Sequence, residues 1–221
     1  MLLVAFCLLT GCRWQSDGRD HNPDNQPAYA RPTPTTEAPR HVVHGPAVRA
    51  GQGLLHVVNG ADAVRVRVAD LGDRLFEVST PDDSKAAPAV DVTDSSVIVG
   101  LRDTGGPGPA VVTAVLSDDV RWTVRLSGGA ADELVDLIGG PGGDVDLTAG
   151  TSRAEVALPA ARGTQRVTMT GGAGTVTIDG QTRTGIPGGS MWTPETWATA
   201  TDRYDINASA GVSTLTVTRS S

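Results

Sequence analysis

Three pairs of adjacent acidic residues are the first candidates for chemistry in this chain: Asp82–Asp83, Asp118–Asp119 and Asp132–Glu133. Two carboxyl groups about 5 to 9 Å apart can hydrolyse a glycosidic bond, one as acid and the other as base or nucleophile. Adjacent residues in a strand, however, point to opposite faces, and aspartate at a turn caps the backbone and faces water. We therefore interpret all three pairs as structural turn residues.

Two short motifs have spacings that could bind a metal ion. The segment His41-Val-Val-His44 could bring two imidazoles to one metal, but no Cys, Asp or Glu adjoins it. The glycine-rich segment 139–146 partly matches the calcium-binding nonapeptide, with Asp144 in place. Its aliphatic position is occupied by Asp146, and a single copy cannot form the ion site that tandem copies make. We expect neither a metal nor a cofactor.

No nucleophile is arranged with a base in the sequence. A Ser-His-Asp triad could form only through His56, beyond which no histidine occurs. Both cysteines, Cys7 and Cys12, lie in the first twelve residues, so the folded part has no thiol chemistry. The formal net charge of −7 provides no basic surface for nucleic acid. The sequence therefore predicts a protein that is not an enzyme and does not bind nucleic acid.

The N-terminal residues predict export and a lipid anchor. Residues 1–12 are an apolar run, too short to cross a bilayer as a helix, that matches the hydrophobic region of a secretory signal. Its ending, Leu9-Thr10-Gly11-Cys12, resembles the bacterial lipobox, in which the cysteine receives diacylglycerol and the signal is cleaved before it. The alternative is a buried strand with an ordinary cysteine. We predict a signal peptide at 1–11, lipidation at Cys12, and an extracytoplasmic protein anchored to the cell membrane.

A tether follows the predicted anchor. Residues 13–46 are polar and rich in proline, with almost no aliphatic side chains before Val42. Such a stretch cannot bury enough apolar area to offset the entropy of ordering it. We predict a disordered, lipid-anchored tether at 12–46 and a folded domain at 47–221.

A strand–turn–strand unit is repeated through the folded part. With Gly129, Gly150 and Gly172 as marks, copies recur every 21 to 22 residues, and the same frame fits Gly60 and Gly211. The repeats are clearest at 121–180 and 203–219. Apolar residues fill all the recurring positions before and after the marks: Leu55, Val57, Val64, Val66, Val124, Leu126, Val135, Leu137, Val145, Leu147, Val156, Leu158, Val167, Met169, Val176, Ile178, Ile206, Ala208, Leu215 and Val217.

Such units bury their apolar face only by stacking on one another, which predicts an all-β, parallel β-solenoid, a single-stranded β-helix. Arg125 and Asp146 would be neighbours on its outer surface, and the glycine column would have positive φ in every coil. The alternative is an antiparallel β-sandwich built from hairpins, which explains the constant spacing less well. The inward columns of the solenoid would be Val124–Val145–Val167 and Leu126–Leu147–Met169.

One segment near the C-terminus interrupts the repeats. Thr193 as N-cap and Pro194 at the first helical position predict a short helix over 193–201. This region holds Trp192 and Trp197, and Tyr204 follows closely. We expect the rings to cap the open end of the solenoid, with Trp197 the more deeply buried. The alternative is an exposed ligand surface on which the rings stack on sugar.

Several positions in the C-terminal half carry a resemblance to a known class of domain: Leu158-Pro159, Gly163, Trp197, Ala200, 202–205, 210–212 and 215–217. With these positions, residues 121–219 resemble the "toast-rack" and "putative-adhesin" class of envelope domains, related to the C-terminal domain of LiaF-type proteins. The resemblance implies a right-handed β-helix on the outer side of a bacterial membrane, without established catalytic residues.

The single lysine, Lys85, among eighteen basic residues indicates a G+C-rich genome, as in actinobacteria.

These expectations combine into one functional prediction: a non-catalytic cell-envelope lipoprotein with a binding, scaffolding or adhesin-like domain. Its expected partners are the membrane, through the lipid anchor, and another envelope protein or cell-wall glycan. The alternative is a module that binds cell-wall glycan, or an enzyme that acts on polysaccharide. Converging carboxylates in a groove would favour the enzyme, and a flat aromatic ladder would favour glycan binding.

Overall fold

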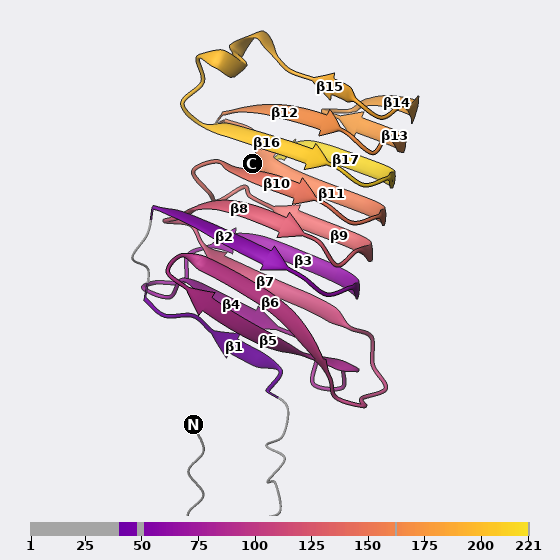
Figure 1. Ribbon diagram of the computed structural model, residues 1–221. Helices are drawn as coiled ribbons and strands as arrows, with labels where there is room; N and C mark the ends of the chain where they lie inside the picture. The colour runs from indigo at the N-terminus through magenta and orange to yellow at the C-terminus, as the bar shows by residue number, and fades with distance from the viewer. Residues whose placement is uncertain (1–39, 48–50, 162, 221) are drawn as a thin grey trace, which may run out of the picture. The chain divides into compact units, whose positions relative to one another are not determined.

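A computed structural model describes residues 40–47, 51–161 and 163–220, which form two facing β-sheets (Figure 1). The predicted signal peptide, Cys12 and most of the predicted tether lie outside the described residues. Within these residues the only helical element is a short 3-10 helix, η2 (Glu195–Ala198), at the position of the predicted helix. No helix in the described part is long and apolar enough to cross a membrane. The all-β class is confirmed.

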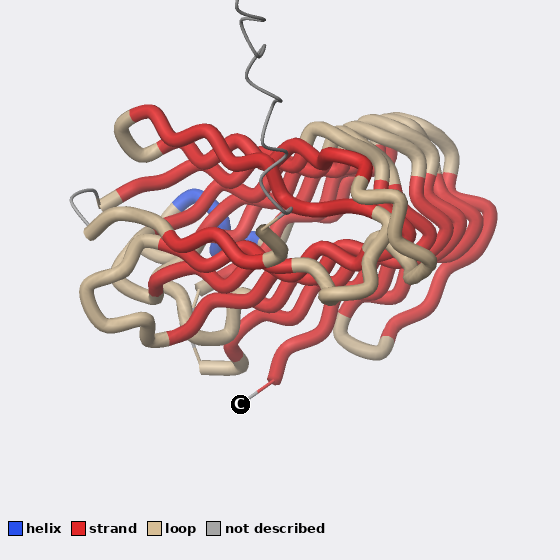
Figure 2. Tube along the Cα trace, turned by 90° about the horizontal axis from the view of Figure 1, so that it is seen from below, coloured by secondary structure: helices blue, strands red, loops and turns tan. Residues whose placement is uncertain are grey.

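The two sheets have nine and eight strands. In spatial order the nine-stranded sheet consists of β1 (Val42–His44), β4 (Phe76–Ser79), β7 (Val111–Ser117), β3 (Ala61–Ala69), β9 (Ala130–Asp136), β11 (Thr151–Pro159), β17 (Val212–Ser220), β13 (Ala173–Ile178) and β14 (Gln181–Ile186). The eight-stranded sheet consists of β15 (Ser190–Trp192), β12 (Thr164–Met169), β16 (Arg203–Ala208), β10 (Gly143–Leu147), β8 (Arg121–Leu126), β2 (Gln52–Val57), β6 (Ser96–Asp103) and β5 (Ala86–Thr93). Figure 2 shows the sheets as separate layers joined by turns that lie over one another.

Each repeated unit places its first strand in the eight-stranded sheet and its second strand in the nine-stranded sheet. The five predicted units do so, and β6–β7 is a sixth unit that the glycine frame did not identify. Neighbouring units pair in parallel in both sheets. Antiparallel pairing is confined to the edges, where β1, β4, β5, β14 and β15 lie. The facing sheets therefore agree with the sandwich alternative, but the parallel pairing at their centres does not.

The order of the units in space differs from their order in the chain. Strand β16 lies between β10 and β12, so that Val145 pairs with Ile206, and Ile206 pairs with Val167. The predicted column is correct from Val124 to Val145, but its next step, from Val145 directly to Val167, is wrong. The long excursion through β14, β15 and η2 gives the chain enough length to return into this position. Strand β2 similarly lies between β6 and β8.

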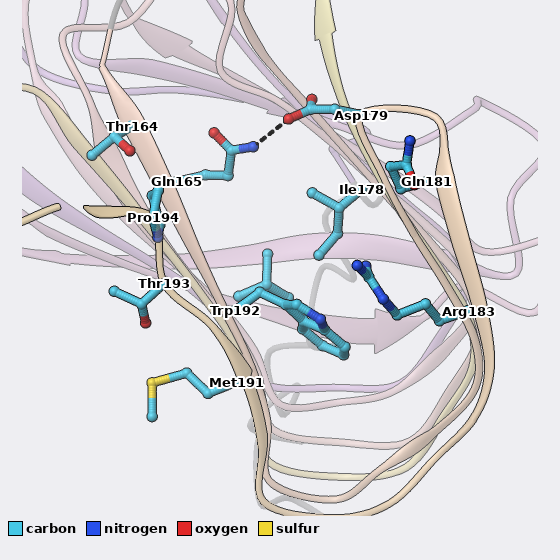
Figure 3. Close-up of a pocket in the computed structure, with 11 residues that line it drawn as sticks. Thr164, Gln165, Ile178, Asp179, Gln181, Arg183, Met191, Trp192, Thr193 and Pro194 are labelled. Atoms are coloured by element: carbon cyan, nitrogen blue, oxygen red, sulfur yellow. Dashed lines mark hydrogen bonds between the residues drawn. The ribbon is translucent and has the colours of Figure 1, made fainter. Parts of the chain in front are cut away.

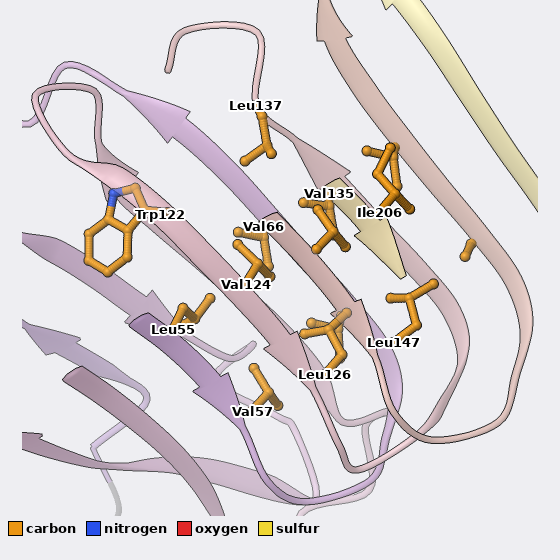
Figure 4. Close-up of a cluster of buried hydrophobic side chains, with 14 of the residues drawn as sticks. Leu55, Val57, Val66, Trp122, Val124, Leu126, Val135, Leu137, Leu147 and Ile206 are labelled. Carbon is orange, nitrogen blue, oxygen red and sulfur yellow. The ribbon is translucent and has the colours of Figure 1, made fainter. Parts of the chain in front are cut away.

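The space between the sheets is filled by the inward side chains of the repeated units (Figure 4). Alternate residues of each strand face this core, as the periodicity predicted. Val167 and Met169 are buried as expected, and Trp122 is buried with its Nε1 donating to the Ser117 carbonyl at 2.9 Å. On the outer face, the Arg125 guanidinium pairs with the Asp146 carboxylate at 3.0 Å, which confirms the predicted neighbours.

Glycine in the turns mainly allows neighbouring units to approach closely. An unusual backbone conformation is required at fewer of these positions. Among the five marks, φ is positive at Gly129 and Gly172, so the expectation of positive φ in every copy is wrong. Next to the first of these, a Cβ on Gly128 would lie 1.9 Å from the backbone of Asn59 in the adjacent turn. Glycine is therefore needed where stacked turns touch.

The folded part begins earlier than the predicted boundary at residue 47. Strand β1 lies inside the segment 12–46 predicted as a tether, and it pairs antiparallel with β4. Its middle residue, Val43, packs against the core. One inward-facing valine, with Val42 on the exposed face, therefore suffices for an edge strand when a partner strand is available.

Candidate functional site

The two sheets border a cavity, open to solvent, where β12 and β15 face β13 and β14. Its volume is about 640 Å³, within the range of small-molecule sites. Val167 and Ile178 give it an apolar floor that continues the core, and Met191 lies at its outer side, 58% exposed. Figure 3 shows Arg183 and Trp192 directed toward one another across this space. We refer to it below as the end cavity.

Strand register places Arg183 and Trp192 on the core side of their sheets. Arg183 lies opposite Val176 in the β13–β14 hairpin, and Trp192 lies opposite Val167 in the β12–β15 pair. Directly opposed residues share a face of the sheet, and both valines are buried. The guanidinium carbon of Arg183 is 5.7 Å from the centroid of the Trp192 ring, a cation–π distance.

The opposite edges of the sheets are closed differently. There β4 contributes Phe76, which is fully buried, and β5 contributes Ala86 and Ala87, which are also buried. Apolar side chains thus complete the core at that end. At the end cavity the last layer instead contains Arg183, an exposed residue of edge strand β14, beside the Trp192 ring. A charged side chain at this position protects the sheet edge and also leaves a polar group beside an apolar floor.

A hydrogen-bonded network fixes one rim of the end cavity. The Nε of Arg219 donates to Oε1 of Gln165 at 2.8 Å. The Nε2 of Gln165 donates in turn to Oδ2 of Asp179 at 2.6 Å (Figure 3). Asp179 and Gly180, both with positive φ, form the two-residue turn of the β13–β14 hairpin. The Asp179 carboxylate is therefore engaged, and the side chains of Gln181 and Thr193 remain exposed at the rim.

The three aromatic residues predicted as an end cap or ligand surface lie in three different environments. Trp192 lines the end cavity. Trp197 is half-buried and lies outside the cavity lining, with its ring centroid 4.5 Å from the Arg166 guanidinium carbon and 5.7 Å from that of Arg203. Tyr204 is fully buried, and its hydroxyl donates to the Gly140 carbonyl at 3.2 Å. We expected the Trp197 ring to insert into the core. It does not, because η2 contains no buried residue.

Two of the acidic pairs occupy turns as predicted, but the third does not. Asp82–Asp83 and Asp118–Asp119 lie in turns, whereas Asp132–Glu133 lies within β9. Asp132 is exposed, and Glu133 is only 3% exposed. The interpretation of Asp132–Glu133 as turn residues is wrong, because the alternation that buries Val135 also turns Glu133 inward.

Glu133 is the only acidic or basic side chain that is buried in the described part of the chain. Its strand neighbours on the same face are Val64 and Ala154, and its Oε2 has no hydrogen-bond partner. Burial away from water raises the pKa of this carboxyl from 4.5 to about 7. A carboxyl without a partner in an apolar layer is more stable in its neutral form. Its ionisation therefore lowers the free energy of unfolding of the domain.

The partial calcium motif provides two outward carboxylates on β10. Burial, and then the nearby Asp205 carboxylate, raise the pKa of Asp144. Asp146 is paired with Arg125. No group of three or more His, Cys, Asp or Glu side chains within the described residues is placed to hold a metal ion.

The three histidines in the described residues have separate partners. Nδ1 of His41 is 2.9 Å from the Thr80 hydroxyl, whereas Nδ1 of His44 is 3.3 Å from the Glu77 carboxylate. The ring Nε2 of His56 lies 2.8 Å from the hydroxyl of Ser127, which also contacts a threonine. No carboxylate in the described part orients the His56 ring, so the third member of a catalytic triad is not supplied there.

Comparisons with known proteins support the fold and no closer relation. No protein-family model matches this chain, and no curated protein sequence matches it. Among solved structures, it is similar to a protein from Clostridium sporogenes described as a "putative cell adhesion protein". The similarity covers 82% of this chain and 100% of that one, with a TM-score of 0.50 and 15% sequence identity. An identity this low shows a shared fold alone.

Sequence analysis found Trp192 but missed Arg183, Gln165 and Asp179. A signal for them was present: Asp179-Gly180 between alternating strands is the strongest short-range hairpin pattern. That hairpin would have placed Arg183 on the same face as the apolar residues of β13. The pairing of β15 with β12 has no comparable sequence signal.

Proposed function

We propose that this chain is a non-catalytic, adhesin-like binding protein of the bacterial envelope and that the end cavity is its binding site. The observation that carries the proposal is the last layer of the core, where Arg183 and Trp192 face an open cavity. The shared fold with the Clostridium sporogenes protein described as a "putative cell adhesion protein" supports an adhesin-like role. A lipid anchor at Cys12 would hold the domain outside the cytoplasmic membrane.

The end cavity favours binding over hydrolysis. Among the described residues, Asp179 is the only carboxylate that lines it, and one of its oxygens already accepts a hydrogen bond from Gln165. Hydrolysis of a glycosidic bond in the usual way needs two carboxyl groups placed on either side of that bond. A glycan-binding module is therefore the better supported of the two alternative functions.

We also infer that the six units constitute a two-sheet β-solenoid. Their parallel pairing and their identical order in both sheets support this interpretation. Its right-handed sense, the relation to LiaF-type proteins and the actinobacterial origin stay predictions. If the solenoid is correct, the end cavity is its terminal layer, and edge strands β14 and β15 are its last elements.

Binding to envelope material tests the proposed site. We expect Trp192→Ala to lower the amount of purified protein retained on isolated cell-wall sacculi at least tenfold, because the ring forms one wall of the end cavity. Trp197→Ala is the matched control, since it removes the same side chain from the outer surface nearby. Circular dichroism must show both variants folded. Equal retention of Trp192→Ala and wild type would contradict the proposed site.

Lipidation tests the proposed location. We expect Cys12→Ala to remove the protein from the membrane fraction or leave it as an uncleaved precursor, because the lipobox cysteine is the acylated residue. Cys7→Ala, within the apolar run, should remain acylated and membrane-bound. Mass spectrometry of the N-terminal peptide measures both outcomes. An unmodified Cys12 in protein taken from its native membrane would exclude the anchor.

A further inference from the structure

We propose that the end cavity binds an anionic saccharide, with the sugar ring against Trp192 and its carboxylate or phosphate paired with Arg183. This inference rests on the proposed binding function of the same cavity. It specifies the chemistry of the ligand, which the proposed function leaves open. The argument depends on the charge, the aromatic wall and the rim of the cavity.

Arg183 provides the charge that selects an anion. Within the described residues, no carboxylate forms an ion pair with Arg183. Its guanidinium lies against the Trp192 ring. By contrast, Arg166 is paired with Asp205, and Arg219 lies 4.0 Å from Asp179. A guanidinium that stacks on a ring keeps its N–H groups free in its own plane, where they can bind a carboxylate or phosphate with two parallel hydrogen bonds.

Arg183 is exposed to solvent on edge strand β14 and lines the end cavity. The side chain lies on the core side of β14, at a position where the preceding strand has the buried Val176. An aliphatic residue there would extend the apolar core over Val167 and Ile178. An arginine instead keeps the end cavity polar on one wall and apolar on its floor. That combination is the usual composition of a site for a small ligand with one charged group.

The remaining surfaces of the end cavity suit a sugar ring. A saccharide has an apolar C–H face, which stacks on an aromatic ring, and hydroxyl groups around its edge. Trp192 supplies the ring, while Gln181 and Thr193 supply uncharged hydrogen-bonding groups at the rim. Asp179 lies at the turn of the same hairpin as Arg183, where it accepts a hydrogen bond from Gln165 and the Arg219 guanidinium, 4.0 Å away, offsets its charge.

Titration with matched sugars tests the proposal. The probes are glucose, glucuronate, glucose 6-phosphate and inorganic phosphate, added to the full-length protein at low ionic strength and followed by tryptophan fluorescence. We expect at least one of the two anionic sugars to bind tenfold or more tightly than glucose. The stronger of the two identifies the source of the anion as carboxylate or phosphate. Inorganic phosphate should bind weakly, because it lacks the ring that stacks on Trp192.

Variants separate this inference from the proposed function. Arg183→Gln should reduce binding of the anionic sugar to the level of glucose, whereas Arg102→Gln, an exposed arginine on β6, should change nothing. Equal binding of glucose and both anions, or an unaffected Arg183→Gln, would overturn the anionic class. If inorganic phosphate binds as well as the sugars, or no sugar binds at all, the saccharide is wrong. In each of these cases, retention on cell wall that depends on Trp192 would leave the proposed function standing.

Discussion

Replacing Leu215 with aspartate is expected to prevent stable folding of the two-sheet domain. Leu215 is fully buried on β17, between Ala154 of β11 and Val176 of β13. The substitution removes a buried aliphatic side chain and leaves a carboxylate without a partner, at a cost of at least about 4 kcal/mol. Whole domains are stable by only about 5 to 15 kcal/mol, so most of the margin would be lost.

The neighbouring position provides a matched control. Thr214 precedes Leu215 on β17, points to the outer face and lies beside Arg153 of β11. Thr214→Asp therefore introduces the same residue in the same strand, next to a positive charge, and should change the free energy of unfolding by less than about 1 kcal/mol. Urea unfolding followed by tryptophan fluorescence measures both variants.

Leu215→Ala keeps the test informative if the aspartate variant does not fold, with an expected loss of about 2 to 5 kcal/mol in the free energy of unfolding. Similar losses for the variants at both positions would show that the inward register of β17 is wrong.

Glu133 is expected to make the domain less stable as the pH rises through neutrality. Its pKa is about 7 in the folded protein and 4.5 as an ordinary carboxyl. Between these values the unfolded chain binds fewer protons than the folded chain, so the free energy of unfolding falls with increasing pH. The loss amounts to about 3 kcal/mol between pH 4 and pH 8 and is nearly complete above pH 7.

Glu133→Gln should remove this dependence while keeping the shape of the side chain. We expect it to have the stability of wild type near pH 4 and to exceed it by about 3 kcal/mol at pH 8, because glutamine does not ionise. Asp132→Asn, at the adjacent exposed position, should leave the pH dependence of wild type unchanged. Urea unfolding at several pH values gives the comparison. A wild type and a Glu133→Gln variant with parallel pH profiles would mean that water or a partner reaches the carboxyl.

Alternation and glycine spacing in the sequence determined most of the local structure. They identified the inward residues of five units and the outer pair Arg125–Asp146. They did so because the side-chain period of a strand is a local property, which each segment carries regardless of its neighbours. The same period already contained Glu133, two residues before Val135, but the acidic side chain was assigned to a turn on its chemical type alone.

Tertiary structure alone decided which units are neighbours and which residues line the cavity at the end of the core. An apolar strand face fits beside any similar strand, so the pattern could not show that β16 lies between β10 and β12. For the same reason, the sequence placed Trp192 and Tyr204 together, although one lines a cavity and the other is buried in the core. Arg183 reaches Trp192 only because β14 and β15, edge strands of different sheets, face each other across the end cavity. The candidate site consists of contacts between the two sheets. No periodic pattern in the sequence indicates which residues make such contacts.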